Sequence, residues 1–201
     1  MSRGQSTLYI DVSDLQKKVE GMKLTLSEAG AKRMLRDTIS NTGRKVKSII
    51  RQEVPKKYEA KPSWVGSQIG KAHNGGAGDL SAVIPIHGAR GVAGARFPAK
   101  GGIKGRGARA SVKLLKGQYS DLPPKMAHQG NNPPFRNPKS DKLGGVVFTR
   151  RTSKPKPIVR VAGLSVPQMP MNKSKEDVTK DIYEYMEKEL DRNFKRMLDK
   201  M

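Results

Sequence analysis

The chain has 201 residues, no cysteine and a formal net charge of +22. Apolar residues make up 35% and aromatic residues 5%, against roughly 45–50% apolar residues, glycine included, in ordinary globular domains. These values exclude disulfides and thiolate metal sites, and they predict one domain over residues 1–201 with a modest core and exposed segments. No run approaches the ~18 apolar residues of a membrane span, and residues 1–11 lack the apolar core of a signal peptide. We therefore expect no membrane partner, and action in the cytoplasm or in a particle assembled there.

The positive charge is concentrated in the middle of the chain. Residues 60–175 hold 21 Lys/Arg and three Asp/Glu, whereas residues 176–201 hold six Lys/Arg and eight Asp/Glu. A segment with this excess of positive charge attracts polyanions. Nucleic acid and an acidic protein surface are both suitable binding partners for it. Charge alone leaves these two partners open.

The N-terminal quarter predicts a strand followed by two helices. Residues 7–12 alternate apolar and polar side chains as a strand does, and residues 13–22 have helical spacing. A long helix is expected over residues 24–54, with Thr25 and Glu28 as a capping box at its start and Pro55 ending it. Its core positions recur every three or four residues: Ala31, Leu35, Thr38, Ile39, Thr42, Val46, Ile49 and Ile50. The other faces are basic, and Gly43 indicates a kink or a close contact.

The middle of the chain changes to a strand-like period. Residues 80–86 and 110–116 predict strands, and residues 87–109 between them hold seven glycines and six Arg/Lys with no acidic residue. That segment cannot bury enough apolar surface to fix itself, so we expect a flexible loop or an arm that a partner orders. Residues 118–140 are a second irregular linker rich in Pro and Asn. Strands at 143–150 and 158–161 complete the set.

The chain ends in a second amphipathic helix, expected over residues 174–200. Ser174 with Asp177 is a weak capping pair, and acidic residues early with basic residues late complement the helix dipole. The predicted fold is therefore α+β. It consists of a small, mainly antiparallel sheet of about four strands packed with two long helices, with long basic Gly/Pro-rich loops.

Signatures of catalysis and of cofactor binding are weak. His73, His87 and His128 lie far apart, and none has a partner at metal-ligand spacing. The stretch Gly66–Ala72 has three residues between its glycines and an alanine after the lysine, so it is not a phosphate-binding loop. The glycine cluster at residues 101–107 lacks the order of a dinucleotide fingerprint. We predict no catalytic, metal or cofactor residues, and a protein that is not an enzyme.

Nucleic-acid binding is the alternative function that the basic loop favours. Six loop cations could neutralise phosphates without reading a sequence: Arg90, Arg96, Lys100, Lys104, Arg106 and Arg109. Phe97 is the one aromatic residue among them, so base stacking is not favoured. The same cations could equally seat the loop on an acidic subunit. Trp64 is expected to be a packing anchor.

Residues 144–170 carry the most informative pattern of the chain, and they point to assembly. A strand ends at Arg150, a basic Lys/Pro connector leads to a second strand, and a turn follows at residues 165–169. The order Gly145-Val-Val-Phe-Thr-Arg150, Lys156-Pro-Ile158 and Gly163-Leu-Ser-Val-Pro-Gln-Met169, with a long terminal helix after it, resembles the minor tail protein Z family of long-tailed phages, also called tail completion proteins. The stretch Thr38–Lys47 followed by Pro55-Lys-Lys-Tyr58 is also similar, and the resemblance covers residues 7–198.

The resemblance implies a structural role and no catalytic residues. It implies a homo-oligomeric ring, expected to be a hexamer, at the head-proximal end of a phage tail or of a headless tail-like bacteriocin. Its partners would be the tail terminator, the tube or sheath, neck or collar proteins, and passing DNA. The location would be the particle itself, assembled in the host cytoplasm. The residues expected at subunit contacts are Phe148, Arg150, Ile158, Ser165, Val166, Pro167, Gln168 and Met169.

Overall fold

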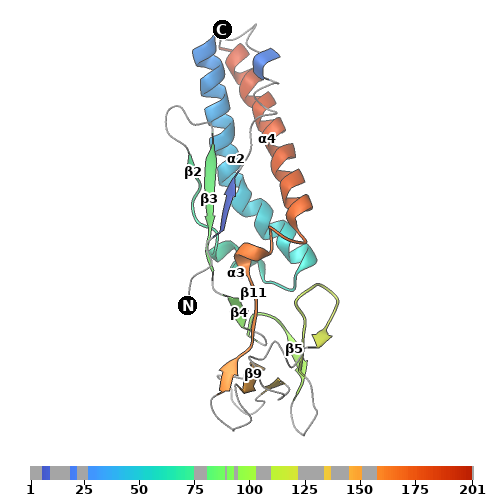
Figure 1. The fold of residues 1–201 in the computed structure, drawn as a ribbon. Coiled ribbons are helices and arrows are strands. Elements are labelled where there is room, and N and C mark those ends of the chain that lie inside the picture. The colour runs from blue at the N-terminus through green and yellow to red at the C-terminus, as the bar shows by residue number, and fades with distance from the viewer. Residues whose placement is uncertain are drawn as a thin grey trace.

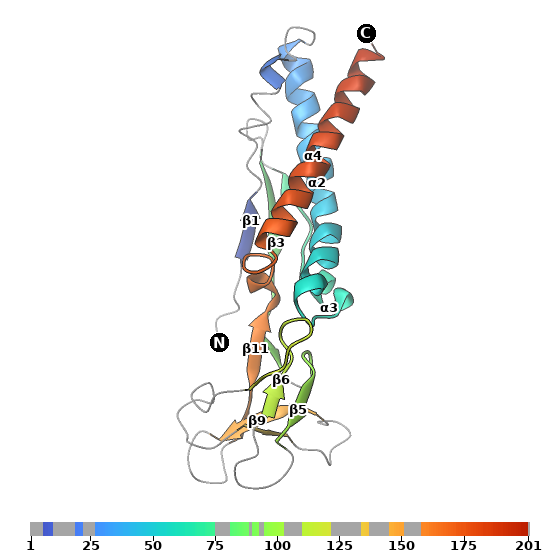
Figure 2. The same ribbon diagram turned by 90° about the vertical axis from the view of Figure 1, so that its right-hand side faces the viewer.

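The computed structural model shows an elongated molecule, with two long helices at one end and short strands at the other (Figures 1 and 2). It describes residues 6–9, 19–21, 27–74, 81–88, 90–92, 95–102, 110–121, 134–136, 145–150 and 158–200. The predicted α+β class with N-terminal and C-terminal helices is confirmed.

The helical end is built from α2 (Glu28–Lys57) and α4 (Lys175–Leu198), which run antiparallel side by side in both views. Their facing residues follow the helical period, so each helix places one continuous apolar stripe against the other. All the core positions predicted for α2 are buried. Fully buried side chains contribute roughly 1.5–3 kcal/mol each, and in this layer they include Met34, Ile39, Val46, Ile50, Met186 and Leu190.

A three-stranded antiparallel sheet covers another side of α2. It has the order β1-β3-β2, with β1 (Ser6–Tyr9), β3 (Ala82–Ile86) and β2 (His73–Asn74). Strand β3 alternates buried and half-buried residues, which is the pattern of a strand with one face on the core. Gly43 of α2 allows the close approach, because a Cβ there would lie 3.0 Å from the Cβ of Ala72. The close contact predicted at Gly43 is confirmed.

The lower end of the molecule holds the other strands in three small antiparallel sheets. One is β4 (Arg90–Val92) with β11 (Ala162–Ser165), and another has the order β5-β6-β7, from β5 (Ala99–Gly101), β6 (Ala110–Val112) and β7 (Ser120–Asp121). The third has the order β10-β9-β8, from β10 (Ile158–Arg160), β9 (Val147–Arg150) and β8 (Phe135–Arg136). The described part therefore contains eleven short strands in four sheets, and the prediction of about four strands in one sheet was wrong.

The two ends of the molecule meet where α2 finishes. The Tyr58 side chain is buried, and its hydroxyl accepts a hydrogen bond from the Lys173 backbone N–H at 3.2 Å. The backbone N–H of Glu59 donates to Leu114 O, and that of Lys116 donates to Lys57 O, both at 2.9 Å. These bonds fix the strand region to the helices, and α3 (Pro62–Ser67) follows directly.

The segment between the strands and α4 is a compact 3₁₀ turn, η2 (Val166–Gln168). Gln168 Oε1 accepts hydrogen bonds from the Ser165 N–H at 3.1 Å and from Ser165 Oγ at 3.0 Å. Val166 and Met169 are fully buried beneath it. The predicted turn is thus a capped 3₁₀ turn with a buried apolar side, and it connects β11 to the start of α4.

The helices differ from the sequence prediction at two boundaries and at one cap. Ser27 caps α2 by accepting from the Gly30 N–H at 3.2 Å, so the expected cap at Thr25 was wrong. Pro55 lies inside α2, because the turn after it is held by the Tyr58 N–H bond to Val54 O and by burial of Tyr58. Helix α4 begins at the expected place, but Ser174 forms no capping side-chain hydrogen bond.

Two stretches expected to be irregular contain ordered structure. The loop at residues 87–109 includes β4 and β5, and its Phe97 is fully buried. The linker at residues 118–140 includes β7 and β8. Strand β4 pairs with β11, far along the chain, whereas β5, β7 and β8 pair with β6 or β9 roughly ten residues away. All four strands have only two or three residues, too few to show an alternating pattern in the sequence. Residues 103–109, 122–133 and 137–140 lie outside the description.

Phe97 is the core residue of the β4–β11 pair. Its ring meets the Trp64 ring edge-on at 5.6 Å, which confirms Trp64 as a packing anchor. Glycines form two of the walls: a Cβ at Gly163 would lie 2.8 Å from Phe97 Cε2, and one at Gly91 would lie 2.6 Å from the same atom. Only glycine leaves room for the ring at these positions.

We predict that Gly163→Ala destabilises the protein by about 1–3 kcal/mol, because the added methyl group overpacks the ring of Phe97. Gly21→Ala is the matched control: nothing lies within 4 Å of its added Cβ, and its helical backbone favours alanine. Urea unfolding followed by circular dichroism measures both variants. Equal stability of the two variants would contradict this packing.

Candidate interaction surfaces

The outer face of α2 is a line of cations. Arg33, Arg44, Lys47 and Arg51 are all exposed, and their spacing puts them on one side of the helix, opposite the buried stripe. We call these four residues the basic face. None of them forms a salt bridge with a carboxylate among the described residues. Lys32, on the flank, differs because it pairs with Glu28 at 2.8 Å.

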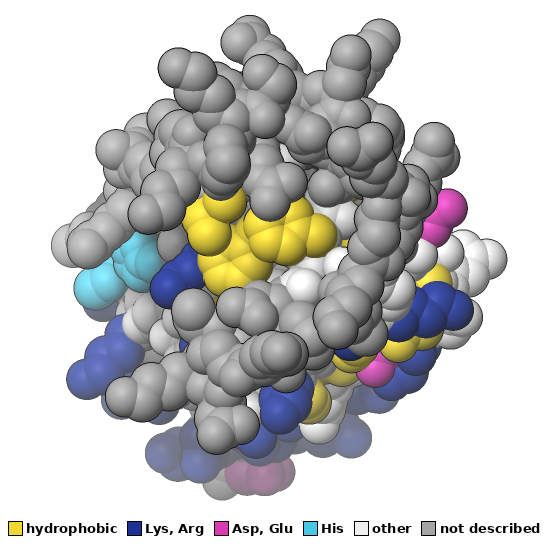
Figure 3. Space-filling view, turned by 90° about the horizontal axis from the view of Figure 1, so that it is seen from below, with side chains coloured by type: hydrophobic (Ala, Val, Ile, Leu, Met, Phe, Trp, Pro, Cys, Tyr) yellow, Lys and Arg dark blue, Asp and Glu magenta, His cyan; other side chains and the backbone are white. Residues whose placement is uncertain are grey.

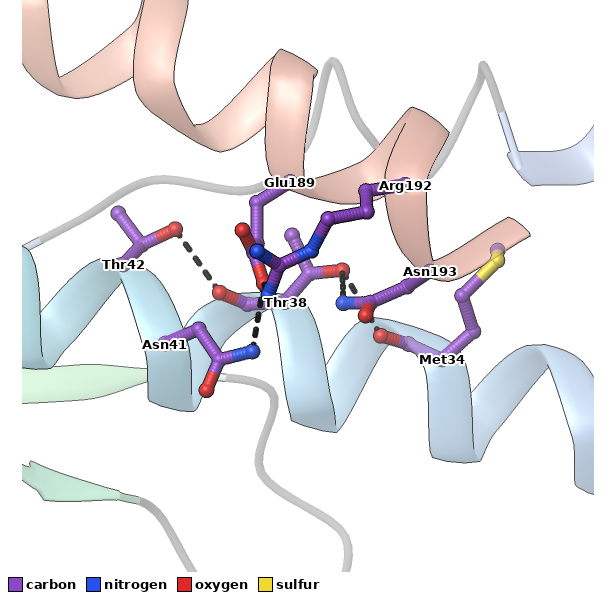
Figure 4. Close-up of polar contacts among 7 residues, drawn as sticks. All are labelled: Met34, Thr38, Asn41, Thr42, Glu189, Arg192 and Asn193. Carbon is purple, nitrogen blue, oxygen red and sulfur yellow. Dashed lines mark hydrogen bonds and ion pairs between the residues drawn. The ribbon is translucent and has the colours of Figure 1, made fainter. Parts of the chain in front are cut away.

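A buried polar seam joins α2 to α4 (Figure 4). Asn193 Nδ2 donates to Thr38 Oγ1 at 3.1 Å, and Thr38 Oγ1 donates to Met34 O at 2.9 Å. Beside them, Asn41 Nδ2 donates to Glu189 Oε1 at 2.6 Å, and Arg192 Nη2 lies 2.5 Å from the same oxygen. Sliding either helix by one turn would leave the buried Thr38, Glu189 and Asn193 without their partners, so the seam sets the register of the pair.

Buried carboxylates on the helices are paired, which gives them structural roles. Glu189 holds the two contacts just described, and Glu53 lies 2.6 Å from Lys56 Nζ. The hydrogen bond from Lys56 to the Glu53 carboxylate raises the pKa of the lysine. At the end of α2, Lys57 Nζ also reaches Asp177 of α4 at 3.1 Å.

A cleft of about 410 Å³ opens where α2, α3 and the segment before β5 meet. Three exposed cations line it: Lys61, Arg96 and Lys116. Its carboxylate, Glu59, lies 3.0 Å from Lys113 Nζ, so that charge is already neutralised. The sequence names Arg96 but does not bring it together with Lys61 and Lys116, because their proximity depends on tertiary pairing between the segment after α2 and residues 114–116.

The predicted loop cations are only partly described. Arg96 lies over the Trp64 ring at 5.6 Å, and Lys100 lies over the Tyr119 ring at 4.3 Å. The backbone of Arg90 is in β4 while its side chain is outside the description, as are Lys104, Arg106 and Arg109. In the view from the strand end (Figure 3), the described charged side chains are mainly Lys and Arg around a group of hydrophobic side chains.

Most residues predicted at subunit contacts are buried in the subunit itself. Phe148, Ser165, Val166, Pro167 and Met169 pack inside the chain, where they hold β9, β11 and η2. Ile158 and Gln168 are exposed, and the Arg150 side chain is outside the description. A role at a contact therefore stays a prediction, for which Ile158 is the most accessible apolar residue of the set.

The described residues contain no group of three or more His, Asp or Glu side chains that could hold a metal ion. Among the described helices, none is both long and apolar enough to cross a membrane. A scan against protein-family models, a search of curated proteins and a search of solved structures find no match. The candidate sites are therefore surfaces, argued from charge, exposure and packing.

We predict that Asn41→Ala destabilises the protein by about 1 kcal/mol. It removes a hydrogen bond to a charged carboxylate, and the better helix propensity of alanine offsets part of the loss. Asn172→Ala, at an exposed turn residue, is the control and should change stability by less than about 0.5 kcal/mol. Chemical denaturation measures the free energy of unfolding of both variants. If Asn41→Ala is as stable as the wild type, the hydrogen bond from Asn41 to Glu189 does not contribute to stability.

Proposed function

We propose that this protein is a structural subunit of a phage tail or tail-like particle. In this proposal it forms a ring at the head-proximal end, caps the tube and mediates attachment to the terminator, collar or head. The observation that carries the proposal is the ordered set of segments in residues 144–170, followed by a long terminal helix, which resembles tail completion proteins. Among the described residues, that stretch contains β9, β10, β11 and η2 in this order, and α4 follows it.

The physical character of the subunit supports an assembly role. Ile158 is 49% exposed on β10, and this strand has β9 as its single partner in the described sheet. An open strand edge with an exposed apolar side chain is a surface that a neighbouring subunit can cover. Arg160 beside it is also exposed, so the edge combines apolar contact with charge.

Deleting the gene from the genome that encodes it tests the proposal directly. We expect electron microscopy to show particles whose tails are abnormally terminated or unattached to heads, and a plasmid copy of the gene should restore them. Normal tails that join their heads without the protein would refute a completion role.

The ring requires a self-contact, which the exposed strand edge predicts. Ile158→Lys should weaken assembly of the purified full-length chain at least tenfold, because it places a charge in an apolar contact. Leu198→Lys, at a residue that is 38% exposed at the far end of α4, is the matched control. Native mass spectrometry compares the two variants with the wild type, for which we expect hexamers. A wild type that stays monomeric at high concentration would contradict the ring.

Non-sequence-specific nucleic-acid binding through the basic Gly-rich loop is the second candidate. The six Arg/Lys of residues 87–109 without one acidic residue favour it, and Arg96 and Lys100 are exposed. Lys104→Gln/Arg106→Gln/Arg109→Gln should then weaken DNA binding by the isolated chain and lower its dependence on salt. Unchanged binding in this variant would remove the loop as the binding element.

A further inference from the structure

The outer side of α2 is the most strongly cationic described surface that the tail proposal leaves without a role. Helix α2 contains nine Lys/Arg and three Asp/Glu, whereas α4 contains six Lys/Arg and seven Asp/Glu. One of the three acidic residues of α2, Glu53, is buried and paired with Lys56, and Glu28 is paired with Lys32. The basic face therefore has Asp37 as its one nearby acidic residue on the helix.

The basic face has the length of a nucleic-acid contact. From Arg33 to Arg51 the helix rises by ~27 Å at ~1.5 Å per residue. DNA places phosphates ~3.4 Å apart along each strand, so this length spans about eight of them. The side chains between the cations are small or polar, among them Ser40 and Ser48, and they leave the charged groups accessible.

Two hollows extend the cationic surface beyond the end of the basic face. The first, about 380 Å³, is lined by Ser48, Arg51, Gln52, Pro55 and Pro62. It shares Pro55 and Pro62 with the cleft that carries Lys61, Arg96 and Lys116. The exposed cations therefore form one continuous course, by which we mean the basic face together with Lys61, Arg96 and Lys116. The one carboxylate that lines the two hollows is Glu59, which is paired with Lys113.

The composition of this surface favours nucleic acid over a protein partner. Stable protein interfaces have an apolar centre and few lysines. The exposed large apolar residues of the described chain are Tyr119, Ile158, Met171, Tyr183 and Leu198, and none belongs to this course. Single strands are held mainly by stacking on open aromatic rings, whereas Trp64 is already packed on Phe97 and Arg96. A double-stranded backbone remains the best complement.

We propose that the basic face of α2, continued by Lys61, Arg96 and Lys116, binds the phosphate backbone of double-stranded DNA without reading its sequence. The proposal uses none of Lys104, Arg106 and Arg109 and does not depend on the tail assignment. Arg51 is its central residue, because its side chain lies on Gly66 of α3 and lines the first hollow.

Fluorescence anisotropy with a labelled 20-base-pair duplex of arbitrary sequence, over a series of salt concentrations, tests the proposal. Each phosphate contact contributes about 0.9 to the slope of log K against log salt. Arg44→Gln/Lys47→Gln/Arg51→Gln should therefore lower the slope by up to about 2.7 and the affinity on the order of 100-fold at 0.1 M salt. Thermal unfolding of each variant confirms that it is folded.

Two variants of equal charge loss act as controls. Lys188→Gln/Lys195→Gln/Arg196→Gln removes three exposed cations from α4 and should leave the slope unchanged. The loop variant Lys104→Gln/Arg106→Gln/Arg109→Gln separates this proposal from the loop-based candidate. A wild type that does not bind the duplex, an equal loss in the α4 control, or wild-type binding by the α2 variant would overturn the proposal. Tighter, α2-dependent binding to polyglutamate than to DNA would also overturn it, in favour of an acidic protein partner.

Discussion

The packing of α2 against α4 is the constraint on which the rest of the structure depends. One stripe of α2 is buried by α4, a neighbouring side is covered by β1, β3 and β2, and the polar seam fixes the register of the helices. Tyr58 at the end of α2 then positions the turn before α4 and the segment leading to β7. A shift in the helix pair would therefore move the strand end as well.

The same packing decides which charges remain available. The apolar residues of α2 are buried, Glu53 is buried beside Lys56, and Glu28 pairs with Lys32 on the surface. The basic face is left with four cations that form no salt bridge with a described carboxylate. The exposed apolar residues lie elsewhere, with Ile158 on an open strand edge. The subunit thus separates a cationic surface from an apolar edge. This division suits a part that contacts both a polyanion and its own neighbours.

The sequence predicts the helices well because their information is local. The positions from Ala31 to Ile50 repeat with the helical period, and this one signal gives the helix, its buried side and its basic side together. The strand end was less predictable. Strand β4 pairs with β11 about seventy residues later, and Phe97 finds its site between Trp64 and two glycines brought there by that pairing. The glycine-rich composition of residues 87–109 suggested a flexible loop, because composition does not show which distant segment a strand pairs with. Lys61 and Lys116 of the cleft were not predicted for the same reason, whereas the basic side of α2 follows directly from the helical period.

The position of this protein in the particle tests most directly our proposal that it is a structural part of a tail. Particles purified from the organism that encodes it can be labelled with antibody against the chain and viewed by negative-stain electron microscopy. We expect label at one end of each tail, on the side of the head or collar. Label spread along the tube, label at the opposite end, or particles without the protein would contradict it.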